Sequence, residues 1–224
     1  MLLYFLVALP GLLLGLYAQA RVKSAFNKYS QVRTSRNITG AQVARQLLNA
    51  RGLHSVGVER SQGFLSDHYD PRSKVLRLSP DVYDGTSVAA AGVAAHEMGH
   101  ALQDAQGYFA LQIRSAIVPA AQFGSSLAPW IFIAGLLLNF ESLAWVGLIL
   151  FTAAVFFTLI TLPVEFDASK RAKELLVSNN LLYQDEMGGV NKVLNAAALT
   201  YVAAAVSAIL TLLYYAFLLL GRRN

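Results

Sequence analysis

The sequence contains no cysteine, and this absence removes two kinds of chemistry at once. The chain can form no disulfide, and it can offer no thiolate to a metal ion. Any metal site must therefore be built from imidazole and carboxylate groups, and the chain has only four histidines to contribute. The lack of disulfides also suits a cytosolic environment.

Charged residues are scarce as well: they make up 14% of the 224 residues, whereas 55% are hydrophobic and the mean hydropathy is +0.46. Such a chain is too apolar for an ordinary soluble domain and too short for a large transporter. We expect a compact soluble unit and a few membrane spans, with the lipid bilayer as a partner. The net charge of +5 comes from scattered basic residues that are not interleaved with aromatics, which argues against a nucleic-acid partner.

Long apolar stretches predict four membrane spans. Residues 2–19 carry no charge over roughly the ~20 residues that cross a bilayer, and they lack the basic start and cleavage site of a signal peptide. A single helix over 129–162 would be ~50 Å long, so we expect two spans, roughly 116–138 and 143–162, joined by a turn at 139–142. The last span is expected at about 197–220.

The polar segments carry local signals of regular structure. Thr39 and Gln42 form a T-x-x-Q capping box that predicts a helix over 41–51, and the strand-forming run KVLRLS predicts a strand over 74–79. Thr86 or Ser87 can cap a long alanine-rich helix, 86–106, that Gly107 would end.

The predicted helix 86–106 contains an H-E-x-x-H motif, formed by His96, Glu97 and His100. Residues four apart lie on one face of a helix, so both imidazoles can reach one Zn²⁺ ion. Glu97 is rotated by about 100° from His96, which places its carboxylate where it can contact a water on the metal. The motif therefore predicts one catalytic zinc ion with Glu97 as the general base.

A catalytic zinc usually has three protein ligands and an open position for water. No histidine follows His100, so the third ligand must be a carboxylate or one of the two remaining histidines, His54 and His68. We prefer Glu165, because a two-span hairpin returns the chain to the side of the membrane that it left.

Two neighbours of Glu165 are alternatives for the same region of the site. Asp167 is either the third ligand itself or a partner that orients one of the two histidines. Ser169 could serve as such an orienting partner too.

A zinc site of this kind predicts hydrolysis of a peptide bond. The metal would lower the pKa of a bound water to near ~7, and Glu97 would take the proton and return it to the leaving amine. His68 and Tyr69 are candidate donors to the oxyanion. A peptide or membrane-protein substrate could add as a strand along 74–79, although that strand could equally be paired internally; the contacts would come from Lys74, Leu76 and Leu78.

The basic residues predict the orientation of the chain. Twelve Lys and Arg fall in 21–115, four in 163–195 and two at the C-terminus. Four spans place the first two segments on one side of the membrane, and the positive-inside rule makes that side cytoplasmic.

Three blocks together resemble the YugP family of bacterial membrane zinc metallopeptidases: SDHYDP at 66–71, AAHEMGHALQ at 94–103 and LPVEFDAS at 162–169. More distantly the chain is similar to membrane gluzincins such as the CAAX prenyl proteases and the heat-shock membrane proteases, whose second motif reads E-x-x-A-D. Glu165 and Ala168 align with that motif, but Ser169 stands where the family has Asp. The resemblance implies that Glu165 binds zinc and that the protein lies in a bacterial inner (plasma) membrane.

Together these signals predict a mainly α, multi-pass membrane protein with about four transmembrane helices and a small α+β, zincin-like catalytic domain. The expected order is a transmembrane helix (1–20), the cytoplasmic catalytic domain (21–115), a transmembrane hairpin (116–162), a polar helical segment (163–195) that supplies the third ligand, and a last transmembrane helix with a short tail (196–224). The oligomeric state is not predicted.

Two other functions remain open on the sequence. One is a catalytically silent membrane scaffold or interaction protein that keeps a structural zinc site. The other is a zinc hydrolase that acts on a lipid or on another kind of amide.

Overall fold

The computed structural model describes residues 2–221, without the side chains of residues 2–5. The described chain divides into two compact units. The polar unit comprises Gln19–Tyr108 and Val164–Ala198, and the apolar unit takes the described residues of Met1–Ala18, Phe109–Pro163 and Leu199–Asn224. Three long helices contribute residues to both units: α1 (Leu2–Ser30), α7 (Glu141–Ser178) and α8 (Met187–Leu220).

Local sequence signals produce the two shorter helices that matter most in the polar unit. Helix α2 (Gly40–Ala50) begins with the predicted capping box, in which Thr39 and Gln42 each accept a hydrogen bond from the other's backbone N–H. Helix α4 (Val88–Ala105) is capped by Ser87, whose hydroxyl accepts from the Ala90 N–H at 3.1 Å. The chain leaves α4 through Gly107, at a φ of 64° that favours glycine.

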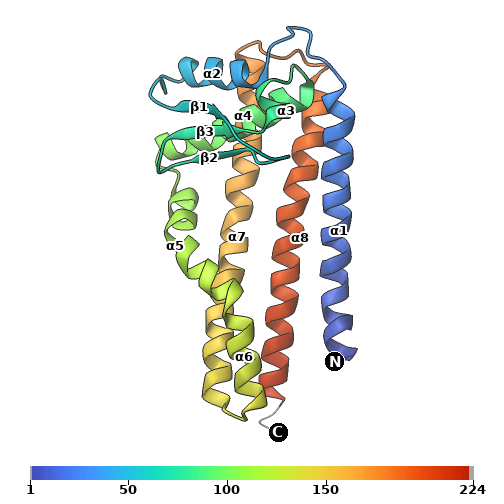
Figure 1. The fold of residues 1–224 in the computed structure, drawn as a ribbon, viewed down its shortest axis with the longest axis vertical. Helices are drawn as coiled ribbons and strands as arrows, with labels where there is room; N and C mark the ends of the chain where they lie inside the picture. The colour runs from blue at the N-terminus through green and yellow to red at the C-terminus, as the bar shows by residue number, and fades with distance from the viewer. Residues whose placement is uncertain (1, 222–224) are drawn as a thin grey trace. The chain divides into compact units, whose positions relative to one another are not determined.

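A three-stranded sheet lies beside these helices, with the short helix α3 (Pro80–Tyr83) after its last strand (Figure 1). The strand order is β1-β3-β2, so β3 (Val75–Leu78) is central, parallel to β1 (Gly57–Arg60) and antiparallel to β2 (His68–Asp70). The predicted strand is therefore present, but it is paired on both sides and offers no edge to an added substrate strand.

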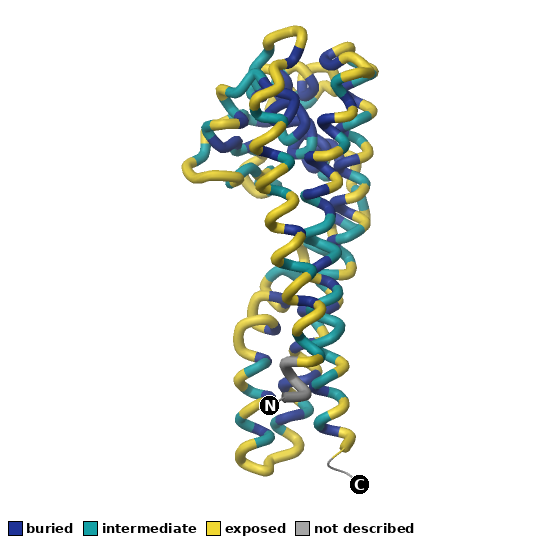
Figure 2. Tube along the Cα trace, turned by 90° about the vertical axis from the view of Figure 1, so that its right-hand side faces the viewer, coloured by how far each residue is buried: buried dark blue, intermediate teal, exposed yellow. Residues whose placement is uncertain are grey.

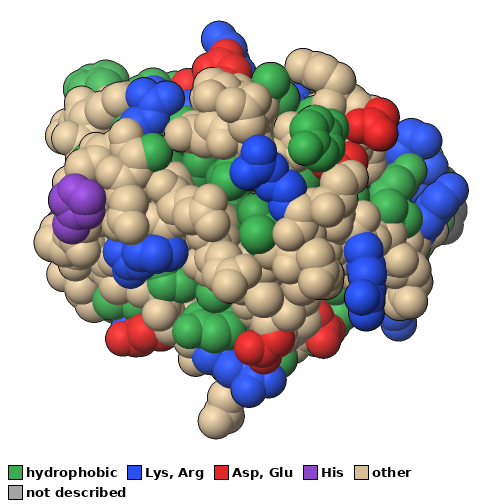
Figure 3. All heavy atoms as spheres, turned by 90° about the horizontal axis from the view of Figure 1, so that it is seen from above, with side chains coloured by type: hydrophobic (Ala, Val, Ile, Leu, Met, Phe, Trp, Pro, Cys, Tyr) green, Lys and Arg blue, Asp and Glu red, His purple; other side chains and the backbone are tan. Residues whose placement is uncertain are grey.

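The core of the polar unit explains why α4 is rich in alanine. Small side chains let α4 pack closely against α2, the sheet and the neighbouring parts of α7 and α8, so that most of the helix is buried. Figure 2 shows the buried residues gathered in this unit. Figure 3 shows basic and acidic side chains interspersed on one face of the surface.

The described residues of the apolar unit form helices joined by short turns. Helices α5 (Phe109–Ser126) and α6 (Ala128–Leu137) follow one another, and a turn through Asn139 leads into α7. A core forms around Phe132, whose ring stacks on Tyr215 with the centroids 4.2 Å apart. The predicted turn between two apolar helices is confirmed.

Three helical segments of the described chain are long and apolar enough to cross a membrane: Phe109–Leu137, Glu141–Ser178 and Met187–Leu220. The expected fourth span, residues 2–19, is helical within α1, but α1 is not among the three, and the side chains of residues 2–5 lie outside the described ones. The described residues thus give three candidate spans, and the expectation of about four is not confirmed.

Helix α7 differs from the prediction in its length. We expected a span to end at 162, before a separate polar segment that starts at Pro163. In the structure α7 is instead one helix of 38 residues that runs through Pro163. Apolar residues and Glu165 therefore lie on one continuous helix.

Candidate metal centre

Helices α4 and α7 approach each other closely at one point in the polar unit. A Cβ atom built on Gly99 would lie 2.7 Å from the backbone oxygen of Ala168, which is nearer than real Cβ contacts come. Glycine at 99 and a small residue at 168 therefore allow the two backbones to meet. This contact brings the H-E-x-x-H face of α4 to the side chains of α7.

Three potential ligands converge beside this contact. His96 and His100 lie one turn apart on α4, with ring centroids 4.8 Å apart and ring planes at 84°. Glu165, on α7, places its Oε2 atom 3.2 Å from Nε2 of His96 and 3.5 Å from Nε2 of His100. The ligand atoms of the three residues all lie within 4.8 Å of one another.

The donor set and the two distances from Glu165 to the histidines fit a zinc ion. Zinc binds imidazole nitrogen and carboxylate oxygen at ~2.0–2.2 Å, and a tetrahedron of that radius has edges of ~3.4 Å. The two distances from Glu165 to the histidines, 3.2 Å and 3.5 Å, match such edges. Three protein ligands would leave the fourth position for water. His96, His100 and Glu165 could therefore hold one metal ion.

Burial shapes the electrostatics of this cluster. Glu165 is only 2% exposed and His100 only 8%. Burial lowers the pKa of His100, but the hydrogen bond with Glu165 and the charges of Glu97 and Glu165 outweigh it, so the pKa lies above its ordinary value. Without a metal, the acidic groups would thus favour a proton on His100; a metal ion would replace that positive charge.

Glu97 is buried beside the three ligands and is not one of them. Its charge raises the pKa of His100 on its own helix, and it also raises the pKa of Asp67 from the loop before β2. Glu97 therefore interacts electrostatically both with a potential ligand and with that loop. The structure thus separates a carboxylate that can bind metal, Glu165, from one that stays free.

The outer nitrogen of each histidine has its own partner. Ser169 Oγ lies 3.2 Å from Nδ1 of His96, in the orienting place predicted for it. Nδ1 of His100 lies 3.0 Å from Oε1 of Gln103. Asp167 is not in the cluster of three; its Oδ2 accepts from Nε2 of Gln103 at 2.8 Å.

Sequence reasoning missed two residues of this site. Gln103 lies three residues after His100, and that helical spacing was the signal that could have identified it. Asp67 lies in the SDHYDP block; it accepts hydrogen bonds from the backbone N–H and hydroxyl of Ser79, and burial, ahead of other causes, raises its pKa. From the sequence, that block carries the family resemblance and predicts roles for His68 and Tyr69 but not for Asp67.

The residues predicted to contact substrate are engaged elsewhere or buried. Tyr69 donates its hydroxyl to Asp104 Oδ2 at 2.6 Å, and Lys74 pairs with the same carboxylate. Burial, and then this hydrogen bond, raise the pKa of Tyr69. Leu76 and Leu78 are fully buried in the core, so a substrate role for them is wrong. Their place on the central strand is the physical reason.

The two histidines outside the motif are exposed. His68 can donate from Nδ1 to the backbone oxygen of Ser66, at 2.9 Å, and it is not among the three converging ligands. His54 lies after α2 with Nδ1 3.3 Å from Oδ1 of Asn49. The structure therefore brings neither of them into the metal cluster.

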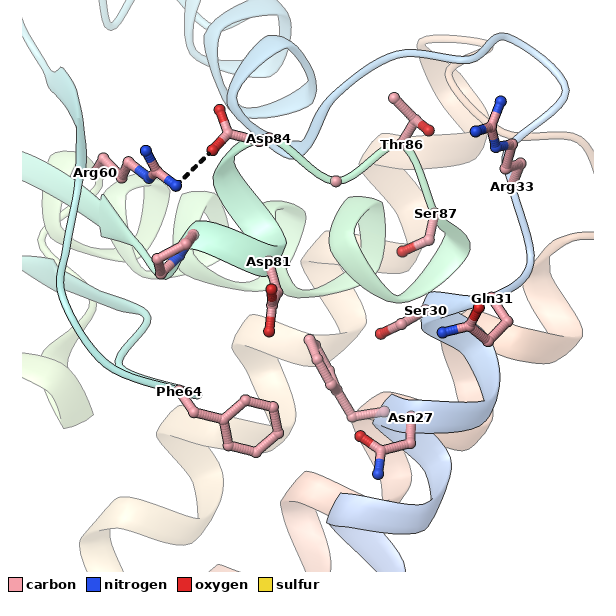
Figure 4. Close-up of a pocket in the computed structure, with 13 residues that line it drawn as sticks. Asn27, Ser30, Gln31, Arg33, Arg60, Phe64, Asp81, Asp84, Thr86 and Ser87 are labelled. Carbon is pink, nitrogen blue, oxygen red and sulfur yellow. Dashed lines mark ion pairs between the residues drawn. The ribbon is translucent and has the colours of Figure 1, made fainter.

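A cavity of about 700 Å³ elsewhere in the polar unit is lined by the end of α1, the β1–β2 loop and the residues before α4. Arg60 and Asp84 form an ion pair along it, at 3.0 Å (Figure 4). None of the residues that line this cavity belongs to the metal cluster.

Comparison with known proteins places this chain in a family. A family model described as "Putative neutral zinc metallopeptidase" matches residues 4–220. The chain is also 50% identical, over 222 residues, to the "Putative membrane protease YugP" of Bacillus subtilis (strain 168), with 99% of each chain covered. No solved structure matches the chain significantly. The resemblance drawn from the three sequence blocks is thus confirmed, and the chain belongs to the "Putative neutral zinc metallopeptidase" family, with a YugP-type membrane protease as a relative.

Proposed function

We propose that this protein is a membrane-bound, zinc-dependent endopeptidase. The observation that carries the proposal is the convergence of His96, His100 and Glu165 at zinc-ligand spacing, with Glu97 buried next to them. Structural zinc sites usually have four protein ligands, whereas three ligands with a nearby free carboxylate are typical of a hydrolytic site. Membership of the family supports the same conclusion.

The reaction needs a proton acceptor beside the water that attacks the peptide carbonyl. A zinc ion held by the three ligands would supply the Lewis acid that lowers the pKa of this water and polarises the carbonyl. Glu97 accepts the water proton, because its carboxylate follows His96 on the same helix turn and lies close to His100. Glu97 then donates that proton to the amine of the leaving peptide.

The burial of Glu97 also suits its role as a base. Its side chain is shielded from bulk solvent, with 8% of the residue exposed, so a proton that it takes is not readily lost to bulk water. A second acidic group, Asp67, lies near enough for the charge of Glu97 to raise the pKa of Asp67.

We further propose that the substrate is a peptide or a membrane protein and that the polar unit faces the cytoplasm. The Bacillus subtilis relative is named "Putative membrane protease YugP", which supports a protease of the membrane. The three apolar helices support a protein that spans the bilayer several times, and most Lys and Arg fall in the two polar segments. In this arrangement the predicted segments 21–115 and 163–195 form the catalytic domain.

The experiment is the substitution Glu97→Gln in the full chain, purified in detergent and loaded with zinc. We expect the variant to keep one zinc per chain and to lose at least ~100-fold in cleavage of casein or of an unfolded membrane protein. Glu174→Gln is the matched control, because Glu174 is an exposed glutamate on α7 with a long 3.9 Å contact to Lys170. It should leave cleavage unchanged.

Two outcomes would contradict the proposal. Undiminished proteolysis by the Glu97→Gln variant would remove Glu97 from the mechanism. A wild-type protein that binds zinc and cleaves no peptide would favour the membrane scaffold, or a hydrolase for lipids or other amides if such a substrate were turned over.

A further inference from the structure

Gln103 is a polar side chain with no exposed surface, held between α4 and α7 inside the polar unit. Its amide nitrogen and its amide oxygen both form hydrogen bonds within the protein. Its Nε2 lies 2.8 Å from the backbone oxygen of Val164 and 2.8 Å from Oδ2 of Asp167, and its Oε1 lies 3.0 Å from Nδ1 of His100. A buried amide costs free energy unless it is satisfied in this way, so its surroundings determine how it is oriented.

The two partners of Nε2 allow only one orientation of the amide. A backbone carbonyl can only accept a hydrogen bond, and an ionised carboxylate also only accepts. Arg171 Nε donates to the same Oδ2 atom of Asp167, so this oxygen acts as an acceptor. A reversed amide would place its oxygen against two acceptor oxygens, and only one of its two N–H groups would have an acceptor, Nδ1 of His100. Oε1 of Gln103 must therefore face His100.

The orientation of the amide in turn determines the tautomer of His100. Because Oε1 of Gln103 only accepts, Nδ1 of His100 must carry the hydrogen, and Nε2 is then left with its lone pair. Nε2 is the atom that lies 3.5 Å from Glu165, in the ligand cluster. We propose that Gln103 is a positioning residue that fixes the tautomer and ring plane of His100, and that Asp167, held by Arg171, fixes the orientation of Gln103.

The second histidine shows why this arrangement is specific to one ligand. Nδ1 of His96 faces the hydroxyl of Ser169, which can either donate or accept. Ser169 can therefore hold the ring of His96 but cannot select its tautomer. Of the Nδ1 contacts of the two ligands, the one at His100 selects a tautomer, and it connects that ligand through Gln103 to Asp167 and Arg171 of α7.

This proposal deepens the proposed function, on which it rests in treating His100 as a zinc ligand. Outer partners of metal-bound histidines typically change metal affinity by about 10- to 100-fold when they are removed. The substitution Gln103→Met keeps a side chain of similar length and removes all three hydrogen bonds. We expect it to weaken zinc binding by about 10- to 100-fold in competition with a chelator.

The matched control is Gln106→Met at the C-terminal cap of the same helix. Gln106 accepts from Arg171 Nη1 at 2.5 Å but is exposed and has no contact with His100 among the described hydrogen bonds. It should bind zinc as the wild type does. Asp167→Ala, which removes one of the two acceptors of Gln103 and leaves Val164, should lose less affinity than Gln103→Met and keep one zinc per chain.

The tautomer itself can be measured by NMR of protein labelled with ¹⁵N-histidine, since the full chain has only four histidine rings. In the wild type, His100 should show the Nδ1–H form, both with zinc and in metal-free protein at alkaline pH. In Gln103→Met it should show a mixture of tautomers without metal, whereas Gln106→Met should not differ from the wild type. A change in folding alone would not alter the tautomer signal of His100 in this specific way.

The outcomes separate this proposal from the proposed function. An Nε2–H tautomer in the wild type, or unchanged zinc affinity in Gln103→Met, overturns the role of Gln103. A wild type that binds no zinc overturns the proposed function, while the metal-free spectra still decide what Gln103 does. If Gln103→Met does not fold, Asp167→Ala is read by the same spectra, and an unchanged His100 signal together with unchanged zinc affinity contradicts the proposal.

Discussion

The contact between Gly99 and Ala168 predicts that one added methyl group will damage the metal site. In Gly99→Ala the new Cβ would lie 2.7 Å from the Ala168 oxygen, whereas an ordinary van der Waals contact begins at 3.4 Å. The difference is about 0.7 Å, and it must be met by moving α4 away from α7. Neither atom belongs to a flexible side-chain end, so the backbones themselves must separate.

A movement of that size exceeds what a zinc site tolerates. Metal–ligand distances are kept within about 0.2 Å, and functional side chains within about 0.5 Å, of their productive positions. Glu165 would recede from His96 and His100 together, since it lies on α7 and they lie on α4. We expect zinc affinity to fall by about 10- to 100-fold, and overpacking to destabilise the polar unit by about 1–3 kcal/mol.

The assay is chelator competition for zinc, with thermal unfolding of the same samples. The control is Gly188→Ala near the start of α8, because a Cβ at that position meets no atom within 4 Å. It should bind zinc normally and unfold at or slightly above the wild-type temperature. If Gly99→Ala binds zinc as tightly as the wild type, the close approach of the helices is not what assembles the site.

Three further predictions concern the third ligand, the orientation and a surface carboxylate. Glu165→Ala should lose bound zinc and Asp167→Ala should retain it, as metal analysis of the purified variants will show; the reverse result would make Asp167 the ligand. A single cysteine at Gln62, in a chain that has none of its own, should be labelled by a membrane-impermeant reagent only after cells are opened, and labelling of intact cells would contradict a cytoplasmic polar unit. The pKa of Asp70 lies below its ordinary 3.8 because Ser73, the Arg72 N–H and Arg77 hydrogen-bond its carboxylate. The ionised form therefore stabilises the fold above about pH 3.8, and this stabilisation is lost as the pH falls through the lower pKa of the folded state. Asp70→Asn should therefore unfold at a lower temperature than the wild type at pH 7, and the difference between the two unfolding temperatures should narrow in acid. A constant gap from pH 7 to pH 2 would contradict this.

The elements that could be predicted from the sequence are those coded by neighbouring residues. The capping box at Thr39 and the cap at Ser87 both act within one helical turn, and the structure has helices α2 and α4 where they begin. The spacing of His96 and His100 is also local, because four residues make about one turn. These signals need no knowledge of what packs against the helix.

The features that were missed depend on long-range packing. Pairing of β3 with both β1 and β2 depends on which short strands meet, so a strand-like run at 74–79 could not show that its two edges are covered. The helical continuation through Pro163 was also missed, since proline usually ends or bends a helix and only the surrounding packing tolerates it.

The candidate site could be predicted only in part from the sequence. Glu165 was predicted from chain topology and family resemblance, and the structure places it against both histidines of the motif. Gln103 and Asp67 had no motif of their own, because their roles arise from burial and from residues that are distant in the sequence. The contact between Gly99 and Ala168 likewise needs two helices to be placed.

The most direct test of the central claim is metal analysis of the full chain, purified without chelators and compared with the variant Glu165→Ala. The three converging ligands predict one zinc per chain in the wild type and a clear loss of zinc in the variant. A carefully purified wild type with no transition metal, or a variant that retains its zinc at full occupancy, would contradict the account.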